Sequence, residues 1–269
     1  MRAKSCGEEE IFFIGCEGAD VPDSQEFLAA AKDVVDRVVT THTDAVLAAA
    51  GLIATALKGD GVVQAFGTGH SESLATEVAG RAGGLVPTNK IAIRDLVLYG
   101  GAPVDILSDP LLERDPAIAH RLYELAAPHP EDVFVIASNS GINGCIVEMA
   151  QLVKEHGHAL ITVTSLEHTS RATPRHPSGK RLSDFADVVL DNGAPFGDAL
   201  LPLPSGGSVC AVSTITAAYL AQMVNAEAVR LLIEAGVTPP VYLSANVPGG
   251  DEHNKALEDR YAGRIRRGA

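Results

Sequence analysis

Two loops rich in glycine and serine carry the residues of this chain that could bind a charged ligand. The first follows the apolar run 62–66 and opens a helix near Ser71, and the second follows the apolar run 133–137 in the same way. Glycine reaches backbone angles closed to other residues, and the free N–H groups at the start of a helix bind anions. The pair therefore predicts a site for a phosphorylated ligand. The expected binding residues are Gly67, Thr68, Gly69, His70, Ser71, Ser138, Asn139, Ser140, Gly141 and Asn143.

Either loop alone is also the ordinary strand-to-helix turn of an α/β protein, so the prediction depends on the pair. The first loop lacks the third glycine of a dinucleotide-binding fingerprint. It also lacks the Gly-Lys-Ser/Thr sequence of a P-loop.

Two carboxylates on the helix after the first loop are the candidates for catalysis. Glu72 and Glu77 are five residues apart, so they do not share one stripe of the helix. Glu77 lies about one and a half turns beyond Ser71, roughly 9 Å along the helix, which suits the reach from a phosphate to C2 of a hexose. We expect Glu77 to be the general base. The alternative is a surface ion pair with Arg81 at i, i+4.

The histidines offer one further catalytic candidate and one binding candidate. His253 lies in the polar segment 249–254 and could be a second acid or base if this segment reaches a neighbouring subunit. Otherwise it caps a C-terminal helix. His70 belongs to the first loop and is expected to bind. No spacing of His, Cys or Asp predicts a metal site, and no cofactor is expected.

The elements that must position these residues alternate along the chain. One long helix or two are expected between Asp23 and Gly59, and an all-round apolar helix from Val209 to about Ala235. Alternating strands and helices predict a parallel sheet covered on both faces, with ligands at the carboxyl ends of its strands. The expected strands are 62–66, 91–98, 133–137, 159–164 and 188–190, and the expected helices are 72–82, 116–126 and 142–155.

Composition limits the class of protein. A net charge of −13 argues against nucleic acid and anionic membranes as partners, and the apolar runs are too short or too interrupted for a membrane span. The four cysteines show no C-x-x-C spacing, which predicts reduced thiols in the cytoplasm. With 46% hydrophobic residues, the 269-residue chain can bury a substantial core.

Positive charge gathers in one segment in the middle of the chain, residues 168–184. We interpret it as a solvated loop, with a lid or subunit contact that brings cations toward the phosphate as the alternative. Its cationic residues and histidine are Arg171, Arg175, His176, Lys180 and Arg181.

The two loops resemble the phosphosugar-binding motifs of the sugar isomerase (SIS) domain family, G-x-G-x-S and S-x-S-G-x-S/T/N. The resemblance covers roughly Asp23 to Met223. Segments 81–87, 178–180 and 248–254 look like a single-domain bacterial subgroup, and within it the chain is similar to actinobacterial N-acetylglucosamine-6-phosphate dehydratases. SIS isomerases and etherases often place their catalytic Glu ten positions after the loop Ser, and here Arg81 stands at that position.

The resemblance implies a three-layer α/β/α fold with a central parallel sheet and a helical N-terminal arm. The expected division is a leader of unclear structure over 1–22, a SIS phosphosugar-binding domain over 23–245 and a tail over 246–269. We expect a homodimer or higher homo-oligomer whose partner is a small sugar phosphate.

The implied activity begins with removal of the C2 proton of an amino-sugar 6-phosphate and continues with elimination of water. The alternatives are an aldose–ketose phosphosugar isomerase and a non-catalytic sugar-phosphate sensor or regulatory subunit. No helix-turn-helix with a basic face precedes Val62, which argues against a DNA-binding sensor.

Overall fold

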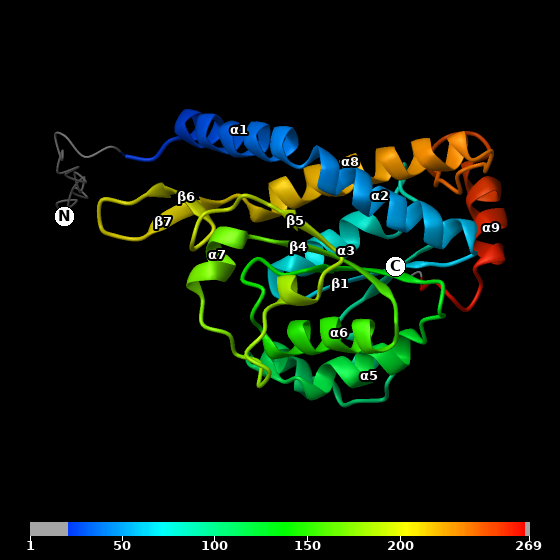
Figure 1. Ribbon diagram of the computed structural model, residues 1–269, viewed down its shortest axis with the longest axis horizontal. Coiled ribbons are helices and arrows are strands. Elements are labelled where there is room, and N and C mark those ends of the chain that lie inside the picture. Colours follow the sequence, from blue (N-terminus) through cyan, green and yellow to red (C-terminus); the bar gives the residue numbers. More distant parts are fainter. Residues whose placement is uncertain (1–20, 267–269) are drawn as a thin grey trace, which may run out of the picture.

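A five-stranded parallel sheet forms the centre of the molecule, in the order β2-β1-β3-β4-β5 (Figure 1). The structure, a computed structural model, describes residues 21–266. In the sheet register, Val63 of β1 lies opposite Thr88 of β2 and Val133 of β3. The strands are β1 (Val63–Gly67), β2 (Thr88–Ile91), β3 (Val133–Ala137), β4 (Ala159–Thr164) and β5 (Val188–Asp191).

Helices cover both faces of this sheet, which confirms the predicted three-layer α/β class (Figure 1). On one face lie α1 (Ser24–Thr41), α2 (Thr43–Lys58), α3 (Glu72–Val78) and α8 (Ser213–Glu234), and on the other α4 (Asp95–Leu98), α5 (Ala117–Ala126) and α6 (Gly144–Glu155). The remaining elements are η1 (Gly69–Ser71), η2 (Val104–Ser108), η3 (Leu112–Arg114), α7 (Leu166–Arg171), η4 (Leu182–Phe185), β6 (Ala199–Pro202), β7 (Ser208–Ala211) and α9 (Gly250–Arg260).

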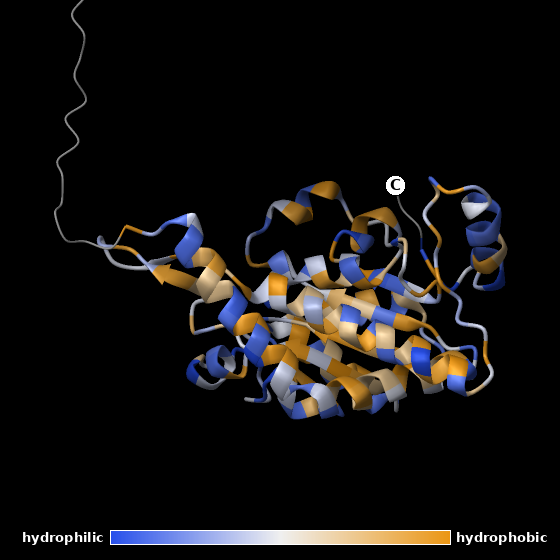
Figure 2. Cartoon of the chain, turned by 90° about the horizontal axis from the view of Figure 1, so that it is seen from above, coloured by the Kyte–Doolittle hydropathy of each residue, from blue (hydrophilic) through white to orange (hydrophobic). Residues whose placement is uncertain are grey.

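The apolar strands fill two separate cores because successive side chains of a strand point to opposite faces. On β3, Val133 and Val135 join the core under α2 and α8, whereas Phe134 and Ile136 join the core over α5 and α6. Figure 2 shows the apolar residues concentrated in the sheet and in the helices packed on it. Burial on both faces explains why these strands read as continuous apolar runs.

The N-terminal arm consists of two helices rather than one. Asp23 begins α1 by accepting hydrogen bonds from the backbone N–H groups of Gln25 (2.8 Å) and Glu26 (2.9 Å). The chain bends by 66° between α1 and α2, at His42. Beyond the sheet, α1 contacts the β6–β7 hairpin, and the two project from the same end of the molecule (Figure 1).

Between residues 21 and 266, no single helix is long and apolar enough to span a membrane. The bent pair of helices α1 and α2 reaches the length and apolarity of a span only when the two are counted together. Cys145 and Cys210 are free thiols. Cys6 and Cys16, and nearly all of the expected leader 1–22, lie outside the described residues.

Three predicted elements differ from the observed ones. The predicted strand 91–98 is wrong, because β2 ends at Ile91 and buried Asp95 turns the chain into α4 by accepting from the N–H of Ala92 (3.1 Å). The predicted helix 72–82 ends at Val78, where the next residue is extended and Gly80 has a φ of +77°. Both differences arise from local turns, which the spacing of apolar residues does not reveal.

The predicted helix 209–235 begins later, because its first residues form strand β7 of a hairpin that the sequence did not predict. Asp198, in the loop before β6, starts α8. Its carboxylate accepts hydrogen bonds from the backbone N–H of Ser213 (2.8 Å) and from the Ser213 hydroxyl (2.7 Å). The start of this helix is therefore fixed by a residue fifteen positions away.

The C-terminal segment packs on the amino ends of the strands. Tyr242 and Tyr261 form a small apolar cluster with Val62 and Val86. After α9, Arg264 forms an ion pair of 2.5 Å with the fully buried carboxylate of Asp132. This segment therefore covers the edge of the sheet opposite the two loops.

Candidate functional site

The two glycine-rich loops lie side by side at the carboxyl edge of the sheet. They follow β1 and β3, which are neighbours, with Gly67 paired to Ala137. Between them and the start of α8 is a pocket of about 240 Å³, called here the loop pocket. It brings together Ser71 and Asn139, both predicted to bind, with α8. The lining residues are Ser71, Ser73, Leu74, Ala137, Asn139, Val163, Asn192, Ser213, Thr214 and Ala217.

The first loop requires glycine at its first position. A Cβ at Gly67 would overlap the backbone oxygen of Ser71, so any larger residue would displace the turn. Thr68 is buried, whereas His70 is exposed and its carbonyl accepts from the hydroxyl of Ser73 (2.7 Å). The loop therefore places Ser71 at the pocket and turns His70 to solvent.

The second loop is held by its own side chains. Ser138 accepts from the N–H of Gly141 (3.1 Å), whose φ of +64° is open to glycine. Asn139 accepts through Oδ1 from the amide of Asn192 (3.0 Å). Asn192 is buried and lines the loop pocket, although it lies fifty-three residues from Asn139 in the chain. No sequence signal pointed to it.

Asn143 lies at the start of α6 but does not cap it. Its Nδ2 donates to Oε1 of Glu113 (2.9 Å), and its Oδ1 accepts from Nη1 of Arg175 (3.0 Å). The other oxygen of Glu113 is 3.5 Å from the place a Cβ would take at Gly69. Glu113 thus contacts the second loop and lies beside the first. No sequence pattern pointed to it, because it lies in an irregular stretch between β2 and α5.

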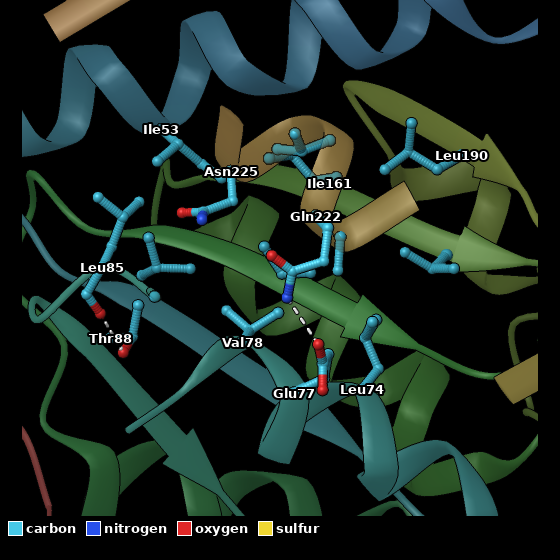
Figure 3. A pocket seen from close by; sticks show the side chains of 16 residues that line it. Ile53, Leu74, Glu77, Val78, Leu85, Thr88, Ile161, Leu190, Gln222 and Asn225 are labelled. Atoms are coloured by element: carbon cyan, nitrogen blue, oxygen red, sulfur yellow. Dashed lines mark hydrogen bonds between the residues drawn. The ribbon is translucent and has the colours of Figure 1, made fainter. Parts of the chain in front are cut away.

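Glu77 faces a second and larger pocket, shown in Figure 3 and called here the apolar pocket. Its carboxylate accepts from Nε2 of Gln222 (2.6 Å) and pairs with Arg81, the partner expected at i, i+4. The apolar pocket has a volume of about 580 Å³. It is lined by Ile53, Val63, Leu74, Glu77, Val78, Gly84, Leu85, Thr88, Val135, Ile161, Val163, Leu190, Ala221, Gln222, Val224 and Asn225.

The two pockets adjoin, because Leu74 and Val163 line both. Helix α3 runs along them, with Ser71 just before it at the loop pocket and Glu77 at the apolar pocket. Glu72 lines neither of these two pockets and forms ion pairs with Arg94 and, at 3.7 Å, Lys90.

His253 lies at the opposite edge of the sheet from the loops of its own chain. Its Nε2 is 3.0 Å from the carbonyl oxygen of Val241, and the adjacent Asn254 exchanges two hydrogen bonds with the backbone of Leu243. His253 therefore sits away from the loop pocket in its own subunit, and a catalytic role through a neighbouring subunit stays a prediction. Between residues 21 and 266, no group of three or more His, Cys, Asp or Glu residues could hold a metal ion.

A family model for the SIS domain matches residues 26–165. The chain belongs to the SIS-domain family. It is 41% identical over 240 residues to a UPF0309 protein of Listeria monocytogenes, covering 89% of this chain and 97% of that protein. It is 38% identical over 232 residues to a UPF0309 protein of Geobacillus kaustophilus, covering 86% and 91%.

Two solved structures share the fold. One is a candidate phosphosugar isomerase involved in capsule formation from Bacteroides fragilis, with a TM-score of 0.51 and 18% identity, covering 89% of this chain and 95% of that one. The other is a phosphoheptose isomerase from Neisseria gonorrhoeae, with a TM-score of 0.50 and 17% identity, covering 76% and 95%. Neither UPF0309 relative is named for an activity, so the likeness to N-acetylglucosamine-6-phosphate dehydratases rests on sequence motifs alone.

Proposed function

We propose that this protein is a phosphosugar enzyme that removes the C2 proton of an amino-sugar 6-phosphate and then eliminates water. The observation that carries the proposal is the adjacency of the two pockets along α3, with Ser71 at one and Glu77 at the other. Glu77 lies six positions after Ser71, roughly 9 Å along a helix. A hexose whose 6-phosphate lies at the loops therefore presents its C2 region near Glu77.

The residues divide into binding and chemistry. Backbone N–H groups and the hydroxyls of Ser71 and Ser140 hold the phosphate without needing a cofactor. Glu77 takes the proton from C2, which is acidified by the neighbouring aldehyde of the open-chain sugar. Gln222 and Arg81 orient its carboxylate through the contacts described above. The product of this step is an enolate.

Two outcomes diverge from the enolate. Loss of the C3 hydroxyl gives a dehydratase, the reading that the motif resemblance favours. On a sugar phosphate that carries a hydroxyl at C2, return of the proton to C1 instead gives a ketose, and this second candidate, an aldose–ketose isomerase, is supported by the phosphoheptose isomerase and the candidate phosphosugar isomerase that share the fold.

Incubation of the purified protein with N-acetylglucosamine 6-phosphate in deuterated water separates the candidates. A dehydratase yields a product lighter by one water in the mass spectrum, with Glu77→Gln as the inactive control. Because a ketose can form only from a sugar with a hydroxyl at C2, glucose 6-phosphate is the second probe, and an isomerase converts it to a ketose phosphate of the same composition that carries solvent deuterium. Binding without either product would contradict both enzymes and favour the sensor or regulatory subunit.

A further inference from the structure

The basic segment 168–184 directs one of its arginines to the second loop. Its other cations have partners elsewhere. Arg171 lies over the ring of Phe196 at 4.2 Å, and Lys180 over the ring of Phe185 at 4.8 Å. Arg181 donates to two backbone carbonyls of the same segment, those of Thr169 (3.0 Å) and Ala172 (3.1 Å).

Arg175 instead donates through Nη1 to Oδ1 of Asn143, the last residue of the second loop, at 3.0 Å. The orientation of the Asn143 amide is fixed from its other side, because its Nδ2 donates to Glu113. A guanidinium has five N–H donors, and Asn143 is the hydrogen-bond partner of Arg175 within the described part of the chain. Four donors are therefore left for a ligand.

A buried histidine anchors Arg175. The adjacent His176 has a side chain only 5% exposed, and its Nε2 lies 2.6 Å from Oε2 of Glu148 on α6. Oε1 of the same carboxylate is 2.7 Å from Nε2 of His120 on α5. Nδ1 of His176 is 2.8 Å from the hydroxyl of Ser178, which holds the ring from its other side. The segment is thus fastened to α6, the helix that begins at the second loop.

We propose that Arg175 recognises the phosphate of the substrate, from outside the two loops, and that His176 positions it. The proposal rests on the proposed function. Neither loop contains a lysine or an arginine, and the chain has a net charge of −13, so a phosphate dianion at the loops lacks a side-chain cation of its own. Arg175 supplies it, and its planar donors match phosphate oxygens two at a time.

Titration calorimetry with N-acetylglucosamine 6-phosphate and with inorganic phosphate tests this role. Arg175→Gln should weaken both affinities at least about 10-fold, the scale of a hydrogen bond to a charged group. Arg175→Lys keeps the positive charge but loses the planar set of N–H donors, so its affinities should lie between those of the wild type and of Arg175→Gln. The matched control is Arg171→Gln, which removes the same charge from the same segment. Its affinities for both probes should stay within about twofold of the wild-type values.

The outcomes distinguish a failure of the proposed function from a failure of the role of Arg175. If the wild-type protein binds neither probe, the proposed function and this role are both overturned. If it binds and Arg175→Gln binds equally well, only the role of Arg175 is overturned. An equal loss of affinity in Arg171→Gln would assign the effect to the summed positive charge of the segment. It would exclude a specific contact between Arg175 and the phosphate.

A double-mutant cycle tests the positioning role of His176. His176→Asn should weaken phosphate affinity in the wild-type background but add little in the Arg175→Gln background, because its effect passes through Arg175. Additive losses in the double variant would contradict positioning. Folding of each variant is checked by its thermal unfolding, which Arg175→Gln should leave unchanged because the Arg175 side chain is exposed.

Discussion

At the scale of single residues, the site separates binding groups from a reacting group. Replacing Ser71 or Ser140 by alanine should weaken sugar-phosphate binding by about 1 kcal/mol or more each, because each hydroxyl would donate to a charged oxygen. Isothermal titration measures the loss. Ser170→Ala is a useful control, since the exposed Ser170 donates to the carbonyl of Glu167 within α7 and lines neither pocket. Unchanged affinity in both loop variants would remove the loops from the site.

Glu77→Gln should retain binding and lose turnover by a factor of at least ~10², the usual contribution of a positioned base. The variant keeps the volume of the side chain and can still contact Gln222. Calorimetry and a product assay on the same preparation separate the two effects. Normal turnover would move the base to Glu72 or His253.

At the scale of elements, α8 is a wall of both pockets, and its first turn depends on Asp198. Asp198→Ala removes acceptors from two N–H groups, those of Val212 and Ser213, and should destabilise the protein by about 1 kcal/mol. Urea unfolding measures this loss. Binding of sugar phosphate should weaken as well, because Ser213 and Thr214 line the loop pocket.

Asp23→Ala is the matched variant for this prediction. Asp23 also accepts from two N–H groups at the start of its helix, though from the position directly before it, and α1 lines neither pocket. The variant should lose comparable stability and keep its affinity for the sugar phosphate. Equal losses of affinity in both variants would show that stability, rather than the position of α8, controls binding.

At the scale of the whole molecule, His158 links stability to pH. Burial lowers the pKa of this histidine, which is 3% exposed. Its Nδ1–H donates to the carbonyl of Asp132 (3.2 Å), so Nε2 accepts from the hydroxyl of Tyr123 (2.8 Å). The unfolded chain then binds a proton at a higher pH than the folded chain, and stability falls as the pH drops below about 6.5.

Urea midpoints measured from about pH 7.5 down to about pH 5 check this dependence. In His158→Gln the urea midpoint should fall less steeply with decreasing pH than in the wild type. His129→Gln, a change at an exposed position, should show the same fall as the wild type. An identical slope in His158→Gln would assign the pH dependence to other groups.

Assembly is the second prediction at this scale. Helix α8 exposes Ile215 and Tyr219, which are one turn apart and 36% and 50% accessible, and we expect this apolar pair to pack against a second copy of the chain. We expect a two-fold dimer in which His253 of one chain reaches the loops of the other. Mixing Glu77→Gln and His253→Ala proteins should then restore about a quarter of the sites, because half of the dimers are hybrids with one intact site.

A point substitution is preferable to truncation in this test, because the last residues hold buried charges. Arg264 pairs with buried Asp132, and Arg266 pairs with buried Asp95 (3.1 Å). Removing them would leave carboxylates unpaired in the interior, at a cost of several kcal/mol. Tagged mixtures on a sizing column show whether hybrids form. Hybrids without activity, formed from two variants that are each inactive, would confine His253 to its own chain.

The sequence by itself determined the features that local patterns encode. Runs of apolar and β-branched residues specified β3 and β4 to the residue, because both faces of these strands are buried, and glycine with serine marked both loops. Only the tertiary structure decided what meets those loops. Asn192, Arg175 and Gln222 contact partners that lie thirty-two to one hundred and forty-five residues away in the chain, because parallel strands gather distant segments around one edge of the sheet. No local period records such contacts.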